Sequence, residues 1–371
     1  MKKVILGLSG GVDSAVACYL LQQAGYAVEG VFMRNWDSTL NNDVLGNPND
    51  PNEVCPQEVD YLDALAVANK LGIPLHRIDF VEEYWERVFS IFLEEYRHNR
   101  TPNPDILCNK EIKFNSFLEQ ADMMGCDYIA MGHYARSVHQ PSVALLRGLD
   151  GNKDQSYFLC QLTKAQVAKS LFPIGHLTKS EVRSIATAID LPVATKKDST
   201  GVCFIGERRF KAFLENYLPH QPGEMIDTMG RMIGKHDGLM YYTIGQRHGL
   251  SIGGPGDPWF VIGKIPSKNQ LLVGQGFHHP LLYSDRCLVM GLNWLIDDPQ
   301  SITTAQAKFR YRQPDVDVVL HHHEDGSVDV SYPTTVRAVT PGQAAVFYHG
   351  EVLLGGGTIE CVYMNNELRP Y

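Results

Sequence analysis

The first half of the chain alternates short apolar runs with stretches of helical periodicity. The runs KKVILGLS, AVEGVFM, PLHRIDF and CDYIAMGHY are separated by helical patterns such as AVACYLLQQAG and VDYLDALAVANKLG. Strands that are apolar throughout and alternate with helices of about 10 to 15 residues indicate a parallel sheet covered by helices. We therefore predict the α/β class, in which ligands bind at the carboxyl ends of the strands.

The sequence changes in character beyond residue 215. PGEMIDTMGRMIGKHDG and GLSIGGPGDPWFVIGKI combine glycines, turn signals and short strands, which is typical of a small linker domain. After residue 280, VDVVLHHHEDGSVDVSY and AAVFYHGEVLLGGGTIE contain strand pairs with an Asp-Gly and a His-Gly turn. A small β-barrel is the natural closure for such strands. We predict a catalytic domain over 1–213, a central linker domain over 214–278 and a C-terminal β-barrel over 279–371.

Composition limits the class of protein. The chain has 371 residues, 44% of them hydrophobic, which is enough for two or three cored domains. No apolar run approaches the roughly 20 residues that span a bilayer, and Asp13 interrupts the apolar N-terminal stretch, so we expect neither a membrane span nor a signal peptide. Eight scattered cysteines without a CxxC pair favour a reducing cytoplasm.

Charge is distributed unevenly along the chain. The net charge of −9 argues against nucleic acid as a partner only if the charge is uniform. Residues 1–100 contain 8 Lys and Arg against 15 Asp and Glu, whereas residues 164–212 contain 9 against 4. This basic segment is either a solvated helical face or a contact for a phosphate backbone.

A glycine-rich loop, Ser9-Gly10-Gly11-Val12-Asp13-Ser14, follows the first predicted strand and leads into a helix. Adjacent glycines let the backbone approach a ligand, and the first turn of the helix offers unpaired N–H groups to an anion. A glycine pair alone also occurs in ordinary strand-to-helix turns. The full string after an N-terminal strand matches the loop of the ATP pyrophosphatases, and we predict ATP binding there, with Asp13 near a transient Mg²⁺.

Two cysteines lie outside the apolar runs of the sequence. Cys108 is part of TPNPDILCNK, and Cys203 is part of DSTGVCFIG. We expect both to lie in loops, with Pro102 and Pro104 fixing an extended turn that holds Asp105 near Cys108. Neighbouring lysines and arginines would lower their thiol pKa values. Flanking residues favour a small buried hydrophobic role for five other cysteines: Cys18, Cys126, Cys160, Cys287 and Cys361. Cys55 is ambiguous, and we interpret His321, His322 and His323 as an exposed strand end, with no metal site.

A series of sequence motifs resembles those of one protein family. The motifs occur in the same order as in that family and cover all three predicted domains. They are SGGVDS, RTPNPDILCNKEIKF, GHY, GNKDQSYFLCQL, KKDSTGVCFIGERRF, GLMYYTIGQRHGL, YRQ and VTPGQAAVFYHGE. The chain resembles the bacterial tRNA 2-thiouridylases, whose catalytic domain is of the adenine nucleotide alpha-hydrolase-like (PP-loop) type. Only the segment 37–56, which is rich in Asn, Asp and Pro and which we expect to be an exposed, mobile loop, is longer than the family pattern.

The resemblance implies roles for individual residues. The position of Cys203 would carry a persulfide, Cys108 would be the second catalytic thiol, and Asp105 would be a general acid or base. ATP contacts would come from Gly7, Leu8, Ser9, Gly10, Gly11, Val12, Asp13, Ser14, Met33 and Gly132. tRNA contacts would come from Asn103, Pro104, Asp105, His133, Lys153, Asp154, Gln155, Arg310, Tyr311 and Gln343.

The reaction implied by the resemblance is the thiolation of a wobble uridine, position 34, which must leave its stack to reach a buried site. ATP would adenylate the C2 oxygen, sulfur from the persulfide would attack C2, and AMP and pyrophosphate would be released. The expected partners are tRNAs for glutamate, lysine and glutamine and a sulfur-relay donor protein, with the enzyme acting as a monomer. Whether Cys108 and Cys203 are joined at rest, and whether persulfide or released sulfide attacks, stay open.

Two other functions are compatible with parts of the sequence. An amidotransferase or ligase of the ATP pyrophosphatase class would need the glycine-rich loop but neither Cys108 nor Cys203. A non-catalytic nucleotide-binding protein with a β-barrel interaction domain would bind ATP without releasing pyrophosphate. A thiol oxidoreductase is disfavoured because the two cysteines are 95 positions apart without a CxxC motif.

Overall fold

The computed structural model describes residues 1–38, 40, 41, 43, 56–198 and 210–371. Contacts divide the chain into two compact units. Unit 1 comprises Met1–Ser90, Pro104–Phe213 and Gly350–Leu354, and unit 2 comprises Ile91–Asn103, Leu214–His349 and Gly355–Tyr371. Each unit is therefore assembled from segments that are distant in the sequence.

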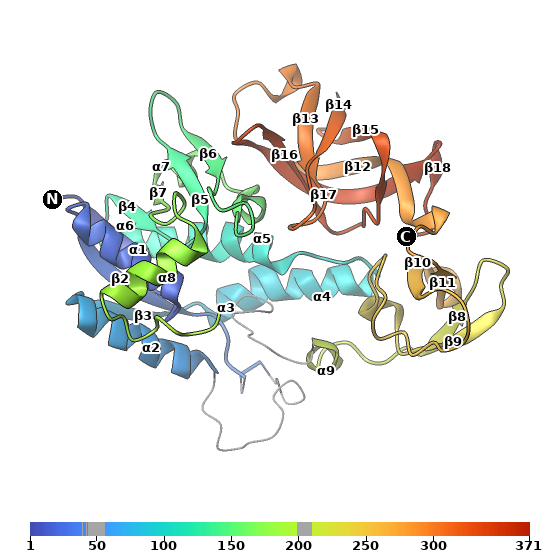
Figure 1. The fold of residues 1–371 in the computed structure, drawn as a ribbon, viewed down its shortest axis with the longest axis horizontal. Helices are drawn as coiled ribbons and strands as arrows, with labels where there is room; N and C mark the ends of the chain where they lie inside the picture. The colour runs from blue at the N-terminus through green and yellow to red at the C-terminus, as the bar shows by residue number, and fades with distance from the viewer. Residues whose placement is uncertain (39, 42, 44–55, 199–209) are drawn as a thin grey trace. The chain divides into compact units, whose positions relative to one another are not determined.

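Unit 1 contains the predicted parallel sheet (Figure 1). Its strand order is β3-β2-β1-β4-β7, and all neighbours run parallel. The strands are β1 (Lys3–Gly7), β2 (Ala27–Arg34), β3 (Leu75–Asp79), β4 (Tyr128–Ala130) and β7 (Ser170–Leu171). Four residues of β1 are buried, three of them completely, as expected for a central strand covered on both faces. The predicted α/β class is confirmed.

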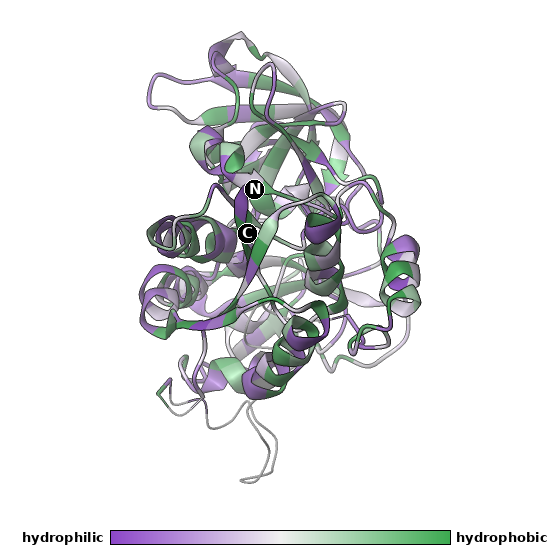
Figure 2. Ribbon diagram, turned by 90° about the vertical axis from the view of Figure 1, so that its left-hand side faces the viewer, coloured by the Kyte–Doolittle hydropathy of each residue, from purple (hydrophilic) through white to green (hydrophobic). Residues whose placement is uncertain are grey.

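Helices bury the faces of this sheet. The core of unit 1 joins Val4, Leu6 and Leu8 to the apolar side of α1 (Val12–Gln23) and to residues of α2 (Pro56–Leu71) and α8 (Lys179–Ala188). Figure 2 shows that the helices carry both hydrophobic and hydrophilic residues, which fits elements that cover a core and face solvent.

Shorter elements complete unit 1. They are α3 (Val81–Tyr84), the π-helices Trp85–Phe89 and Asn109–Ser116, α5 (Pro104–Cys108), α6 (Phe117–Met123), β5 (Ala135–Val138), β6 (Ala144–Arg147), the 3₁₀ turn Ser156–Leu159 and α7 (Lys164–Ala168). Two helices cross the boundary between the units, α4 (Ser90–Arg97) and α9 (Phe210–Glu215).

The central part of unit 2 is a four-stranded sheet. Its order is β10-β11-β8-β9, with β11 and β8 parallel and the outer pairs antiparallel. The strands are β8 (Gly223–Ile226), β9 (Met232–His236), β10 (Trp259–Ile265) and β11 (Gln270–Gln275), with 3₁₀ turns at Leu239–Tyr241, Pro266–Lys268 and Pro280–Leu282. Val261, Leu271 and Val273 are fully buried in its core.

The C-terminal part of unit 2 is a closed six-stranded β-barrel, as predicted. The strand order is β12-β15-β14-β13-β16-β17, and β12 also pairs with β17 to close the ring. The strands are β12 (Tyr283–Trp294), β13 (Thr304–Lys308), β14 (Val316–His322), β15 (Val328–Arg337), β16 (Ala344–His349) and β17 (Val352–Met364), with β18 (Glu367–Leu368) and the 3₁₀ turn Pro299–Ser301 beside them. Gly326 and Gly350 both have positive φ at the predicted turns.

The segment 37–56 departs in part from its prediction as an exposed loop. Leu40 is exposed, but Asn41 and Asp43 are buried, and the indole N–H of Trp36 donates to Asp43 over 3.1 Å. Polar residues here are buried because their side chains and backbone find local partners. Residues 44–55, including Cys55, lie outside the described ranges. Among the described helices, none is both long and apolar enough to cross a bilayer.

Candidate functional site

The glycine-rich loop lies at the carboxyl end of β1, where it turns into α1. Gly10 has a φ of +75°, and a Cβ on it would lie 2.2 Å from the carbonyl oxygen of Asp60. Only glycine fits this position without moving the backbone of α2. The Ser14 hydroxyl lies 3.2 Å from the backbone N of Ser9 and 3.1 Å from the carbonyl oxygen of Gly11, which fixes the loop from inside.

The other two predicted ATP contacts lie at the same edge of the sheet. A Cβ on Gly132 would lie 2.8 Å from the backbone N of Ser14, so the chain after β4 runs directly against the start of α1. Met33 is near the end of β2, and its Cε is 3.0 Å from the position of a Cβ on Gly7. The residues predicted from the sequence to bind ATP are thus brought together at the carboxyl ends of β1, β2 and β4.

A charged cluster is joined to this loop through Asp13. The Tyr134 hydroxyl donates to Asp13 Oδ1 over 2.7 Å, and Lys179 Nζ lies 2.8 Å from both oxygens of the same carboxylate. Lys179 also lies 2.8 Å from Asp198. Burial, followed by the charge and hydrogen bond of Asp13, raises the pKa of Tyr134, so the phenol stays protonated and donates.

Lys179 and Asp198 were not selected in the sequence analysis. Thr178 and Glu181 form a reciprocal capping box, which fixes Lys179 as the first residue of α8. The pattern Thr-x-x-Glu could have located this helix start in the sequence. The partner of Lys179 could not have been found in that way, because Asp13 lies 166 positions away.

Asp198 gathers three cations. Lys153 Nζ lies 2.7 Å from Oδ2, and Arg183 and Lys179 lie 2.7 and 2.8 Å from Oδ1. Burial would raise the pKa of Asp198, but hydrogen bonds from Lys153 and Lys179 and their charges hold that pKa well below its ordinary value. Lys153, predicted to contact tRNA, therefore lies in the same cluster as Lys179.

Lys196 supports the glycine-rich loop from the side of α2. Its ammonium donates to the Gly10 carbonyl over 3.1 Å and lies 2.7 Å from Asp60 and 2.5 Å from Asp63. Burial would lower the pKa of Lys196, but hydrogen bonds to the two carboxylates raise it, so the lysine is charged at neutral pH. Three cations of the basic segment 164–212, Lys179, Arg183 and Lys196, are thus paired with acids around the loop.

Cys108 lies in a helix, and our prediction of a loop at this position is wrong. Pro104 begins α5 and Cys108 ends it, followed directly by a π-helix. Proline suits the first turn of a helix because its φ is compatible and its missing N–H would have no helical partner. Asp105 and Cys108 are three positions apart and so face the same side of this turn. The Cys108 side chain is completely buried.

The other cysteines separate by burial. Cys18, Cys160 and Cys287 are fully buried as predicted, and burial raises the pKa of the Cys18 and Cys160 thiols to about 12. Cys126 and Cys361 are only partly buried, at positions where we expected full burial. Cys203, the predicted persulfide carrier, lies outside the described residues.

Three residues of unit 1 that were predicted to contact tRNA are engaged within the protein. Asp154 is buried and accepts from the backbone N–H groups of Gly148 and Ser156 over 2.9 and 3.1 Å. Gln155 accepts from the Tyr134 N–H over 3.0 Å. His133 is buried against Phe114 and Phe172, and burial, with a smaller effect of Lys113, lowers its pKa, so the imidazole is neutral.

The predicted tRNA residues of unit 2 also have internal partners. Arg310 donates to the Ile244 carbonyl over 2.8 Å and to the Thr340 hydroxyl over 2.9 Å. Gln343 donates to the carbonyl oxygens of Thr101 and Pro102 over 2.7 and 3.3 Å. These contacts join the barrel to the segment that leads toward Asn103 and α5.

The edge around Asp13 has the chemistry that a metal-bound triphosphate needs. Glycine at positions 10 and 132 lets neighbouring backbone pack closely around the loop, α1 presents its N-terminus, and Lys179 supplies a cation. Among the described residues, no cluster of three or more carboxylate, histidine or cysteine side chains could hold a metal. A Mg²⁺ ion at this edge would therefore be held by Asp13 and by the phosphates themselves, as is usual for this ion.

Family models cover most of the chain. The tRNA methyl transferase HUP domain matches residues 2–207, the tRNA methyl transferase PRC-barrel domain matches 211–275, and the aminomethyltransferase beta-barrel domain matches 284–359. The order of the three models agrees with a parallel-sheet domain followed by a small central domain and a barrel.

Curated relatives match over nearly the full length. The tRNA-specific 2-thiouridylase MnmA of Lacticaseibacillus paracasei is 56% identical over 374 residues, covering 99% of this chain and 97% of the relative. The protein of the same name from Listeria monocytogenes is 53% identical over 372 residues, covering 100% and 97%. MnmA 2 of Geobacillus kaustophilus is 54% identical over 367 residues, covering 98% and 96%.

Proposed function

Because the chain belongs to the tRNA-specific 2-thiouridylase family, we propose that it is an ATP-dependent tRNA-uridine 2-sulfurtransferase. It converts the wobble uridine at position 34 of tRNA into 2-thiouridine and releases AMP and pyrophosphate. The observation that carries the ATP-dependent step is the junction of the glycine-rich loop with Asp13, Lys179 and Tyr134 at one edge of the sheet.

ATP is held at this edge, with its phosphates against the loop and the start of α1. Lys179 stabilises charge that develops when the bond between the α and β phosphates breaks. Asp13 would hold Mg²⁺, which would neutralise charge on the triphosphate. Met33 and Gly132 border the nucleotide. The contacts we assign to ATP come from Gly7, Leu8, Ser9, Gly10, Gly11, Val12, Asp13, Ser14, Met33 and Gly132.

The first chemical step joins the C2 oxygen of uridine to the α phosphate, and pyrophosphate leaves with the electrons of the broken P–O bond. This step turns a poor leaving group into AMP. Asp105 stands one helical turn before Cys108 and acts as the general acid or base at the base being modified. Asn103 and Pro104 hold that base.

Sulfur arrives as the terminal atom of a persulfide on Cys203. That sulfur attacks C2, AMP departs with the former carbonyl oxygen, and the Cys108 thiolate then attacks the Cys203 sulfur. The S–S bond breaks, the electrons stay on the sulfur of the product, and Cys108 and Cys203 are left as a disulfide that an external thiol must reduce. Release of free sulfide before the attack would use the same residues.

The substrates are tRNAs for glutamate, lysine and glutamine, and a sulfur-relay protein supplies the persulfide sulfur. We assign the remaining tRNA contacts to His133, Lys153, Asp154, Gln155, Arg310, Tyr311 and Gln343. Several of these have internal partners in the described structure, so they would exchange those partners for tRNA. We further propose a cytoplasmic monomer with domains over 1–213, 214–278 and 279–371.

Transfer of labelled sulfide to unmodified glutamate, lysine or glutamine tRNA, with and without ATP, tests the proposal. The intact protein is compared with Cys203→Ser, and Cys126→Ser serves as a matched control because Cys126 has no assigned role. ATP-dependent label at position 34 that Cys203→Ser abolishes and Cys126→Ser retains is the expected result. Pyrophosphate release without label in tRNA would overturn the thiolation and leave an ATP pyrophosphatase with another nucleophile.

A further inference from the structure

Residues 98–103, which we call the strap, connect α4 to the helix that contains Asp105 and Cys108. The strap belongs to unit 2. It begins directly after α4 ends at Arg97, and Asn99 has a φ of +60°, a left-handed turn that reverses the backbone. Pro104 then starts α5 without any intervening residue. The strap therefore leads directly into α5 along the chain.

Barrel residues hold the middle of the strap through its backbone. The Thr101 N–H donates to the Pro341 carbonyl over 3.1 Å, and Gln343 donates to the carbonyl oxygens of Thr101 and Pro102. Gly342 lets the two backbones approach closely, since a Cβ there would lie 2.9 Å from the Thr101 nitrogen. Arg100 forms an ion pair with Glu360 of β17.

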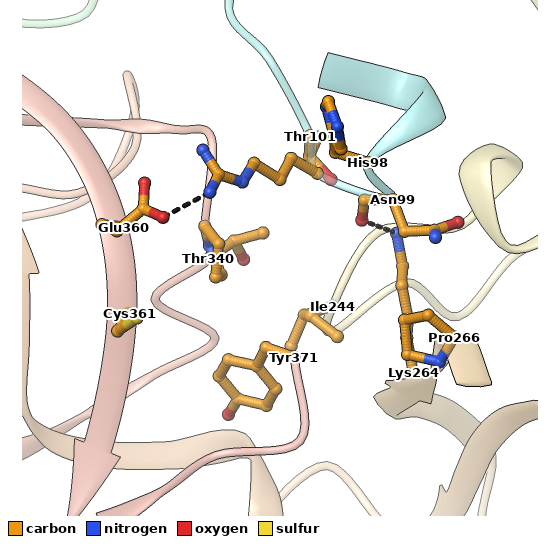
Figure 3. A pocket seen from close by; sticks show the side chains of 12 residues that line it. His98, Asn99, Thr101, Ile244, Lys264, Pro266, Thr340, Glu360, Cys361 and Tyr371 are labelled. Atoms are coloured by element: carbon orange, nitrogen blue, oxygen red, sulfur yellow. Dashed lines mark hydrogen bonds and ion pairs between the residues drawn. The ribbon is translucent and has the colours of Figure 1, made fainter. Parts of the chain in front are cut away.

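A lysine of the central sheet holds the beginning of the strap. Lys264 in β10 is only 4% exposed, and its ammonium donates to the Asn99 carbonyl over 2.7 Å. Figure 3 shows this contact at the wall of a cavity of about 200 Å³ that Thr340, Glu360 and Tyr371 also line. Every one of these groups belongs to unit 2.

A buried lysine is an unusual choice for this position. Burial lowers the pKa of Lys264 to about 7, which shows how poorly the site solvates its charge. A methionine or leucine would fill the space without this desolvation, but it would leave the Asn99 carbonyl without this donor. Protonated or neutral, the amine can donate an N–H to that carbonyl, so the contact is retained on either side of neutral pH.

We propose that Lys264 is a positioning residue for the strap: by holding the left-handed turn at Asn99, it keeps in place the segment that ends at Asn103, to which we assign a contact with the target base. This inference rests on the proposed function for the role of Asn103. Lys264 acts through the strap and touches neither substrate nor cofactor.

Lys264→Met tests the proposal, with Lys264→Arg as the variant that keeps a donor and Lys268→Met as a matched control. Lys268 is exposed in the turn that directly follows β10. The first readout is amide hydrogen exchange of residues 98–103, followed by mass spectrometry. We expect exchange there to be about tenfold faster in Lys264→Met, closer to the parent rate in Lys264→Arg, and unchanged in Lys268→Met.

The second readout is single-turnover thiolation at saturating tRNA and ATP. We expect Lys264→Met to lower the rate constant of thiolation about tenfold, because a misplaced strap slows the chemical step. The dissociation constant of ATP should stay within twofold of the parent value, because ATP binds in unit 1. Unchanged exchange in the strap, or equal losses of thiolation in Lys264→Met and Lys268→Met, would overturn the proposal.

Two further comparisons distinguish a failure of this proposal from a failure of the variant to fold and from a failure of the proposed function. If Lys264→Met does not fold, Lys264→Gln takes its place, because its shorter side chain also stops short of the Asn99 carbonyl. If the parent protein thiolates no tRNA, the proposed function fails, while the exchange of residues 98–103 still decides whether Lys264 holds the strap. Faster exchange spread evenly over the whole of unit 2 would contradict a local positioning role.

Discussion

The loop edge of unit 1 and the strap of unit 2 are held by different kinds of contact. At the loop edge, Asp13, Lys179 and Asp198 are linked by side-chain ion pairs at 2.8 Å. In the strap, Lys264 and Gln343 donate to backbone carbonyls of residues 99, 101 and 102. These contacts join side chain to side chain in the first region and side chain to main chain in the second, although Lys196 also donates to the Gly10 carbonyl and Arg100 also pairs with Glu360.

This difference predicts that the loop edge can exchange its ion-pair partners for a ligand, whereas the strap keeps its hydrogen bonds. An incoming triphosphate with its cation offers Lys179 and Asp13 new partners of opposite charge, so their mutual pair can be replaced at little net cost. A backbone carbonyl has no such alternative partner, and losing its donor leaves a polar group unsatisfied. The loop edge is therefore expected to rearrange when ATP binds, and the strap to stay fixed.

Asp13→Asn is the change that should break the loop edge most completely. It removes the charge that Lys179 balances and that would hold Mg²⁺, so ATP-dependent pyrophosphate release should fall about 10²–10³-fold. The rate of pyrophosphate release is measured in quenched reactions that contain ATP and tRNA. Asp190→Asn is the control, because Asp190 is 97% exposed and pairs only at the surface. Equal rates in the two variants would contradict an exchangeable charge at Asp13.

Gly132→Ala tests whether close backbone approach is as necessary as charge. The new Cβ would lie 2.8 Å from the Ser14 nitrogen, which must shift the start of α1. We expect the free energy of unfolding to fall by about 1–3 kcal/mol and ATP to bind more weakly. Gly151→Ala is matched to it, since nothing lies within 4 Å of a Cβ there. Denaturant titration and ATP titration of both variants would show whether the steric effect of the added Cβ accounts for the changes in stability and ATP binding.

Asp198→Asn tests the ion pairs of the loop edge through the pH dependence of the free energy of unfolding. The folded pKa of Asp198 lies below its ordinary value of 3.8, so its carboxylate contributes stability above that pH and loses it as the pH falls further. The free energy of unfolding of the parent should therefore decline below pH 4 more steeply than that of Asp198→Asn. At neutral pH we expect a loss of about 1 kcal/mol, because the side chain is 31% exposed and partly screened. Parallel pH profiles would contradict the depressed pKa.

Glu360→Gln should have the smallest effect of the four. The Arg100–Glu360 pair is 31% and 28% exposed, and such pairs contribute about 0.2–1 kcal/mol. The backbone contacts of the strap would survive, so thiolation should change less than twofold. Thermal unfolding and a thiolation assay measure both quantities. A loss as large as that of Lys264→Met would mean that side-chain pairs hold the strap after all.

The sequence predicted the features that depend on local pattern. Apolar runs and helical periods identified the parallel sheet, and the Asp-Gly and His-Gly turns identified barrel hairpins. The residues predicted to contact ATP lie near one another, since Gly7, Met33 and Gly132 are all close to the ends of parallel strands, and their binding of ATP stays a prediction. Geometry of this kind follows from the strand order and needs no knowledge of distant side chains.

Features that depend on tertiary contacts could not be predicted. Lys179 is an ordinary residue of a basic segment until folding brings Asp13 beside it, and Lys264 is an ordinary strand residue until the sheet buries it. Burial also does not distinguish Cys108, which we propose to be reactive, from Cys160, because both side chains are completely buried. Two prolines suggested an extended loop before Cys108, although the second one begins a helix.

The short segment 350–354 at the start of β17 is assigned to unit 1, where the Arg147 N–H donates to the Glu351 carbonyl over 2.9 Å and Val352 pairs with Leu146. During synthesis on a ribosome, unit 1 would therefore lack its last strand partner until residues 350–354 had been made. Native structure in unit 1 cannot be complete before the barrel sequence has emerged. A shortened chain ending at residue 213 should consequently need β6 to be protected in another way, and synthesis of residues 350–354 becomes a checkpoint for folding.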